Sequence, residues 1–179
     1  MSDAPVGRRD RRSPGLARNE LKPWRDALRE LCQRTGGQPV SWWLAGSTAL
    51  AVRGAPIEPG DLDVVCEPTD AIMIGELFSD ALIEPVMPHS ADWLGELLGR
   101  AFWEVRIEWV GGVNPHVDEP EPCDFGPEAG RRLEPARFED WEILVPPLDL
   151  QRAVNVRRGL TSRVNMIDAL LDQPGATLA

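Results

Sequence analysis

LAGSTALAVRGAPIEPGDLDVV, residues 44–65, carries the strongest structural pattern in this chain of 179 residues. Residues 40–44 are apolar and β-prone, and Gly46 tolerates backbone angles closed to other residues. The run that follows Gly46 is rich in Ala and Leu, which favours a helix. We therefore predict a strand over 40–45, a tight turn at Gly46 and a helix over 47–54. Free N–H groups at the start of that helix and the Ser47 hydroxyl would then face an anion such as a phosphate. A serine that only caps the helix is the alternative.

Two aspartates follow in a segment, 61–66, whose pattern predicts a second strand. Because alternate side chains of a strand share a face, Asp61 and Asp63 should project together, about 7 Å apart at their Cα atoms, with Leu62 in the core. Adjacent carboxylates repel each other unless a cation lies between them. Oxygen ligands of this kind suit Mg²⁺, which takes further ligands from substrate phosphates. The two parts of the segment thus predict a site for Mg²⁺ and a nucleotide.

Together, Ala45-Gly46-Ser47 and Asp61-Leu62-Asp63-Val64 resemble the signature of the DNA polymerase β-like nucleotidyltransferase superfamily. The chain looks most similar to small bacterial members, such as the antibiotic nucleotidyltransferases and the AbiEii-type toxins. The resemblance implies an α/β (α+β) nucleotidyltransferase fold, with a mixed β-sheet flanked by helices and a C-terminal helical segment. One departure is Glu58, three residues before Asp61, where a basic or hydroxyl residue is common.

The resemblance also implies a third carboxylate on a neighbouring strand. Residues 102–110 alternate, with one face made of Val105, Ile107 and Trp109 and the other of Glu104, Arg106 and Glu108. We favour Glu108 because it lies closer to the Gly111-Gly112 break, and sites of open α/β sheets lie beyond strand ends. Glu104 remains an alternative, and so does a solvated face on which Arg106 pairs with its neighbours. The family residue is usually Asp, so Glu here is a second departure.

The segment from Val145 to Leu171 resembles the closing helices of small nucleotidyltransferases, from which a basic residue commonly reaches the triphosphate. The basic side chains available there are Arg152, Arg157, Arg158 and Arg163. We expect Arg152 and Arg158 to serve as nucleotide ligands, with arginines on a solvated helix face as the alternative. The lysine-aspartate pair common in toxin-like members is absent near Val164 and Asn165.

These features predict an enzyme that moves an NMP, most simply AMP, from ATP or another NTP to a hydroxyl of a small-molecule acceptor such as an antibiotic. Asp61, Asp63 and Glu108 would bind one or, as the family implies, two Mg²⁺ ions, and Gly46 and Ser47 would grip phosphate. Such transfer needs positioning and charge neutralisation rather than a Cys or Ser nucleophile. The alternatives are a toxin-like transferase acting on protein or tRNA, and an inactive fold that binds a nucleotide or a partner.

The composition indicates which binding partners and which cellular compartment to expect. A net charge of −10 argues against a broad nucleic-acid-binding surface, which needs clustered positive charge. Three scattered cysteines suggest neither a disulfide framework nor a zinc site. The arginine-rich start resembles no secretory signal, and no segment has the length and apolarity of a membrane span. We therefore expect a cytoplasmic protein whose oligomeric state the sequence leaves open.

The chain as a whole predicts a disordered tail over 1–16 and one nucleotidyltransferase domain over 17–179, with C-terminal helices from about 147. Besides the elements above, we expect helices over 17–35, 69–79, 90–99, 147–157 and 161–172, and strands over 82–87, 101–110 and 141–145. The proline-rich stretch 111–139 is expected to be irregular, either an insertion or a lid that faces the substrate. Alternating helices and strands indicate a mixed α/β sheet.

Overall fold

The computed structural model describes residues 22–90 and 92–172; the tail predicted over 1–16 lies outside them. The helices and strands follow one another as α1 (Pro23–Thr35), β1 (Trp42–Ala45), α2 (Gly46–Val52), β2 (Asp61–Cys66), α3 (Pro68–Leu77), β3 (Leu82–Pro88), β4 (Gly95–Trp103), β5 (Val105–Val113), the 3₁₀ helix η1 (Pro115–Asp118), α4 (Pro127–Gly130), β6 (Glu134–Phe138), β7 (Trp141–Val145), α5 (Leu148–Arg157) and α6 (Thr161–Leu171).

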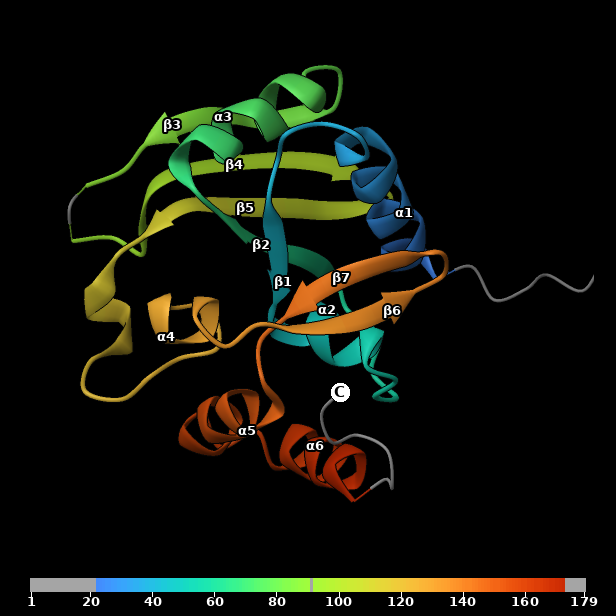
Figure 1. Cartoon of the computed structure of the whole chain (residues 1–179), viewed down its shortest axis with the longest axis vertical. Coiled ribbons are helices and arrows are strands. Elements are labelled where there is room, and N and C mark those ends of the chain that lie inside the picture. The colour runs from blue at the N-terminus through green and yellow to red at the C-terminus, as the bar shows by residue number, and fades with distance from the viewer. Residues whose placement is uncertain (1–21, 91, 173–179) are drawn as a thin grey trace, which may run out of the picture.

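Five strands form the central sheet, in the order β1-β2-β5-β4-β3 (Figure 1). β2 and β5 run parallel, whereas the other neighbouring pairs are antiparallel. β6 and β7 form a separate two-stranded sheet beside β1. The mixed sheet flanked by helices, with two helices closing the chain, confirms the predicted fold class.

One face of the central sheet is covered by α1 and α3 and holds the main core. Its fully buried side chains come from both helices and from β1, β2 and β5, and include Leu28, Leu31, Ile74, Leu44, Leu62, Ile107 and Trp109. Trp24 is also buried in this layer. Since side chains alternate along a strand, the residues directly before and after Leu62 and Ile107 must point to the opposite face. That face therefore receives the acidic side chains of β2 and β5.

The segment before and including β5 differs from the prediction: residues 92–99 are not helical, and two strands, β4 and β5, replace the single strand over 101–110. Leu94, Leu97, Leu98 and Ala101 recur at helical spacing, which favoured a helix. Two glycines weaken that helix, and Gly99 lets the Trp109 ring pack so closely that an added Cβ would lie 2.3 Å from it. Pairing of β4 with β5 along its whole length thus overrides the local pattern.

The stretch 111–139 is also more regular than predicted. It contains the end of β5, η1, α4 and the strand β6, which pairs with β7 from Glu134↔Val145 to Phe138↔Trp141. The carboxylate of Asp118 accepts hydrogen bonds from the backbone N–H of Cys123 (2.9 Å) and of Glu128 (2.8 Å). These bonds tie the loop between η1 and α4 into a defined shape.

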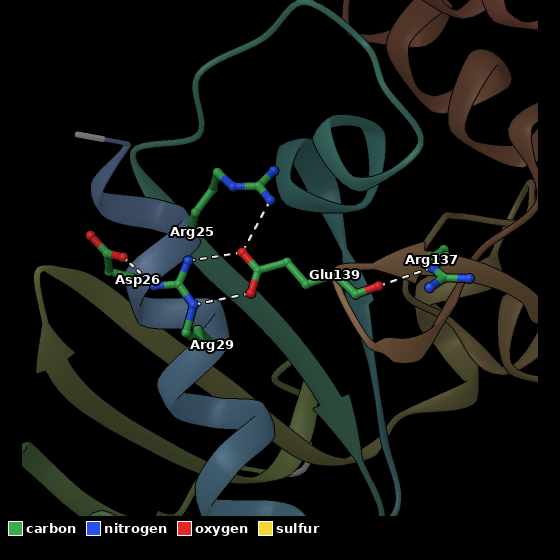
Figure 2. A network of polar contacts seen from close by, with 5 residues as sticks. All are labelled: Arg25, Asp26, Arg29, Arg137 and Glu139. Carbon is green, nitrogen blue, oxygen red and sulfur yellow. Dashed lines mark hydrogen bonds and ion pairs between the residues drawn. The ribbon is translucent and has the colours of Figure 1, made fainter. Parts of the chain in front are cut away.

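A polar network joins α1 to the turn of the β6–β7 hairpin (Figure 2). Arg29 donates to both carboxylate oxygens of Glu139, at 3.0 and 2.8 Å, and Arg25 donates to one of them at 3.2 Å. Asp26 pairs with Arg29, and Arg137 donates to the backbone carbonyl of Glu139. Two arginines on one carboxylate hold the hairpin against the first helix.

We expect Glu139→Gln to lower the melting temperature by about 2–4 °C, because partly exposed ion pairs are each worth up to about 1 kcal/mol. The pKa of Glu139 is lowered, first by its hydrogen bond to Arg29. Its contribution to stability is therefore present above the ordinary pKa of Glu and lost as the pH falls through the lowered value. Thermal unfolding should therefore show a lower melting temperature for Glu139→Gln than for the wild type at pH 7, and equal melting temperatures at pH 3. Glu142→Gln on β7 is the control, and an equal loss there would contradict the role of Glu139.

The two C-terminal helices α5 and α6 lie below the sheet in Figure 1 and pack against each other. Leu50 and Ala55 meet Leu148, Ile167 and Leu170 in a separate apolar cluster, which ties these helices to α2 and the loop that follows it. Within the described residues, no helix has the length and apolar character needed to cross a membrane.

Candidate functional site

Four acidic and basic side chains form two adjacent cross-strand rows on the face of the sheet opposite α1 and α3. In the parallel ladder between β2 and β5, Asp63 lies opposite Glu108 and Asp61 lies opposite Arg106. Residues directly opposite each other are close enough for their side chains to interact. The structure therefore brings Glu108 beside Asp63, and it does so through strand register rather than through a strand end. Glu104 instead occupies the turn between β4 and β5, with a φ of 61°.

Arginines neutralise two of the three carboxylates. Arg106 donates to Asp61 at 2.5 Å, and Arg100, which faces Glu108 from β4, donates to Glu108 at 2.5 Å. Arg100 also pairs with Glu84 on β3, so one row reads Glu84, Arg100, Glu108 and Asp63 across four strands. Charges alternate in this row except at its last step, where two carboxylates meet.

Asp63 is the acid with the least compensation. Its pKa is raised to about 6, first by burial and then by the neighbouring charges of Asp61, Glu108 and Asp124, whereas the charge of Arg106 acts in the opposite direction. On its other side Asp63 faces Ala45 of β1, which offers no charge. A partly buried carboxylate among three others is a place where a bound cation would remove a large electrostatic cost.

The turn between β1 and α2 is shaped around Asp63. Gly46 has a φ of +60°, and a Cβ added there would lie 2.4 Å from Oδ2 of Asp63. Thr48 is fully buried, and its hydroxyl donates to the backbone carbonyl of Asp61 at 2.8 Å, which fixes α2 against the start of β2. The predicted phosphate grip and the predicted metal ligands are therefore in direct contact.

Gly46→Ala should destabilise the protein by roughly 1–3 kcal/mol and displace the Asp63 carboxylate, because a positive φ and a close contact coincide at this position. Gly159→Ala is the matched control: its φ is +67°, yet nothing lies within 4 Å of its Cβ position. Urea unfolding of both variants separates the two effects. A loss at Gly46 no larger than at Gly159 would show that the contact with Asp63 is unimportant.

Asp124 and Gln151 also belong to this site, and sequence reasoning missed both. Asp124 is only 6% exposed, and burial raises its pKa, while hydrogen bonds from its own backbone, from the Gln151 side chain and from the Gly46 backbone act in the opposite direction. Gln151 of α5 is fully buried and donates to the Gly46 carbonyl at 3.1 Å. The loop before α4 and the first C-terminal helix thus hold the Gly46 turn from both sides.

The predicted basic ligands lie in different settings. Arg152 pairs with Asp168 of α6, so a phosphate would have to break that pair to reach it. Arg158 is exposed and lies near enough to Asp124 for its charge to lower the pKa of that acid. Glu58, the departure in the motif, turns away to α1, where it accepts from Lys22 and from the Trp24 indole.

The donor chemistry of the site fits a divalent cation, but the present pairings do not form a ready-made cage. Within residues 22–90 and 92–172, no set of three or more His, Cys, Asp or Glu side chains is arranged to hold a metal ion. The reason is visible in the two rows, because Asp61 and Glu108 are each bound to an arginine. Asp63 lies adjacent to both and forms no ion pair with the other described residues, so it is the carboxylate that lacks a cation.

Comparisons with known proteins agree with this geometry at the level of the fold. No family model matches the chain, and no curated protein matches it in sequence. A crystal structure of the candidate nucleotidyltransferase TM1012 from Thermotoga maritima is similar with a TM-score of 0.58 at 19% identity, covering 83% of this chain and 92% of that one. The antibiotic nucleotidyltransferase ANT(2″)-Ia in complex with adenylyl-2″-tobramycin gives a TM-score of 0.53 at 10% identity, covering 82% and 88%.

The chain therefore has the nucleotidyltransferase fold, as its sequence predicts. Two aspartates on β2, a glutamate on the adjacent parallel strand and a glycine turn packed on the second aspartate occupy one face of its sheet.

Proposed function

We propose that this protein is a Mg²⁺-dependent nucleotidyltransferase that moves AMP from ATP to a hydroxyl of a small-molecule acceptor. The observation that carries the proposal is the register of β2 and β5, which sets Asp63 opposite Glu108 and beside Asp61. Arginines pair with Asp61 and Glu108, but Asp63 lies beside both carboxylates without an ion pair of its own among the described residues, and a bound cation would remove this repulsion. The similarity in fold to an antibiotic nucleotidyltransferase supports the choice of a small acceptor.

In this proposal Asp61 and Asp63 hold the metal, and Glu108 is the third acid. Bound Mg²⁺ would neutralise the triphosphate and acidify the acceptor hydroxyl. Glu108 accepts the hydroxyl proton as the oxygen attacks the α-phosphorus, and the bond to the pyrophosphate leaving group breaks. Ser47 at the Gly46 turn and Arg158 provide contacts for phosphate oxygens. The Gly46 N–H itself is held by Asp124, so Ser47 is the better candidate for this contact.

The acceptor is expected to carry a positive charge. The three predicted metal ligands are acidic, and the whole chain has a net charge of −10, which would attract a cationic molecule. An aminoglycoside satisfies this condition, because it carries charged amines as well as hydroxyls, and so does any other alcohol that bears an amine. A protein or tRNA acceptor, as for toxin-like members, is less favoured by this charge, although a basic protein segment would fit it.

The test is to incubate the purified protein with Mg²⁺, each labelled NTP in turn and a panel of aminoglycosides, neutral sugars, tRNA and basic peptides. Transfer to an aminoglycoside with ATP is the expected result. Transfer only to tRNA or peptide would replace the small acceptor by the toxin-like one. Nucleotide binding without transfer to any acceptor would favour an inactive nucleotide-binding fold.

A further inference from the structure

We propose that Arg106 is a built-in counter-ion that occupies Asp61 while the site holds no metal, and that it thereby sets how tightly a divalent cation binds. The inference rests on the proposed function in one respect, since it takes a divalent cation as the ligand of Asp61 and Asp63. It goes beyond that function by giving a role to a basic residue outside the metal-ligand set.

Placement within the sheet makes Arg106 suited to this role. It lies opposite Asp61 in the β2–β5 ladder, and the two side chains form an ion pair at 2.5 Å. The Asp61 side chain is 29% exposed and the Arg106 side chain 47% exposed, so the pair lies at the open edge of the acid cluster. An arginine with this much access to solvent can leave its partner without losing a buried position.

The surrounding charges explain why the pair forms. Without Arg106, the carboxylates of Asp61, Asp63 and Glu108 would face each other with only Arg100 to compensate them, and Arg100 is shared with Glu84. Like charges on adjacent strands are destabilising. Arg106 therefore stabilises the empty site, and a cation that binds Asp61 must displace it.

Competition of this kind has a measurable consequence. Removing the guanidinium deletes both the ion pair that a metal must break and a positive charge that repels the metal. An exposed ion pair alone accounts for up to about a fivefold change in an equilibrium constant, and the repulsion adds to it. Arg106→Gln should therefore bind a divalent cation about fivefold more tightly than the wild-type protein.

Mn²⁺ alone is a suitable probe, because carboxylate sites that accept Mg²⁺ also accept Mn²⁺ and its free form is counted directly by electron paramagnetic resonance. The full-length protein would be titrated without nucleotide. Arg106→Lys keeps a cation beside Asp61 and should stay within about twofold of the wild type. Arg131→Gln removes an equal charge from an exposed pair with Glu128 on α4 and should change nothing.

A second measurement separates this role from a merely structural one. Without metal, Arg106→Gln should melt at a lower temperature than the wild type, and saturating Mg²⁺ should raise its melting temperature by more than that of the wild type. A structural role alone would lower the melting temperature without strengthening metal binding. Adding Asp61→Asn to Arg106→Gln should cancel the gain in Mn²⁺ affinity, since the freed ligand is then absent.

Mn²⁺ binding by Arg106→Gln that is equal to or weaker than that of the wild type would overturn the inference, as would a gain that survives the loss of Asp61. These outcomes are distinct from a failure of the proposed function. A protein that transfers AMP but shows no gain in Arg106→Gln would keep its function and lose this inference. A clear gain in Mn²⁺ affinity without transfer to any acceptor would support this inference and contradict the proposed function.

Discussion

Asp63→Asn is expected to reduce AMP transfer by at least about a thousandfold, because it removes the carboxylate that lies between Asp61 and Glu108. An amide of the same size keeps the packing against Gly46 but no longer attracts a cation. Loss of metal-ion stabilisation of the transferring phosphoryl group is worth several kcal/mol of barrier. Calorimetric titration with Mg²⁺-ATP should show weak binding or none, and the double variant Asp61→Asn with Asp63→Asn should show none.

The same substitution should make the protein without metal more stable at neutral pH. The pKa of Asp63 is raised to about 6, first by burial and then by the charges of Asp61, Glu108 and Asp124, with Arg106 acting against them. An acid whose pKa is higher in the folded state binds more protons there, so stability falls as the pH rises from about 4 to about 6. Asp63→Asn removes this loss and should add roughly 1–3 kcal/mol at pH 7.

Urea unfolding at pH 7 and at pH 4, in the presence of a chelator, checks the sign of this effect. The variant should be more stable than the wild type at pH 7, and the two should converge at pH 4. Unchanged Mg²⁺-ATP affinity together with unchanged stability would show that Asp63 neither binds metal nor experiences the charges assigned to it.

Glu108→Gln is expected to lower turnover by roughly a hundred- to ten-thousandfold, the range typical of losing a general base. Binding of Mg²⁺-ATP should survive, because Asp61 and Asp63 remain. Single-turnover kinetics and calorimetry together would show this division between chemistry and binding.

Glu104→Gln is the control for this variant, because the structure sets Glu104 in the β4–β5 turn, away from the row that contains Asp63. It should leave turnover within about twofold of the wild type. A large loss from Glu104→Gln, with none from Glu108→Gln, would reverse the assignment. Little effect from either in an active enzyme would direct attention to Asp124, the remaining acid whose charge acts on Asp63.

The local part of the site follows from sequence because its residues are close together in the chain. A period of two predicts that Asp61 and Asp63 share a face, and the same period separates Ile107 and Trp109 from Arg106 and Glu108. Glycine before a short helix also predicted the turn at Gly46. These inferences need only the geometry of one strand or one turn.

The remaining part depends on which strands are neighbours, and a single sequence does not reveal that. Arg100 pairs with Glu108 only because 95–103 forms a strand, whereas a helix was predicted over 90–99. Asp124 reaches Gly46 through a loop that looked irregular, although its position between Cys123 and Phe125 was a sign of burial. The structure sets Glu108 opposite Asp63 through strand register rather than through a nearby strand end, and it sets Glu104 in a turn; the choice of Glu108 as the third acid stays a prediction.

Labelled ATP tests the central claim most directly. With an acceptor that reacts, a label on the α-phosphate should appear in the product, whereas a label on the γ-phosphate should appear in pyrophosphate, and both should require Mg²⁺ and Asp63. Transfer of the γ-label to the acceptor would identify a phosphotransferase and contradict the account. Absence of both labels from every acceptor, despite tight Mg²⁺-ATP binding, would equally contradict it.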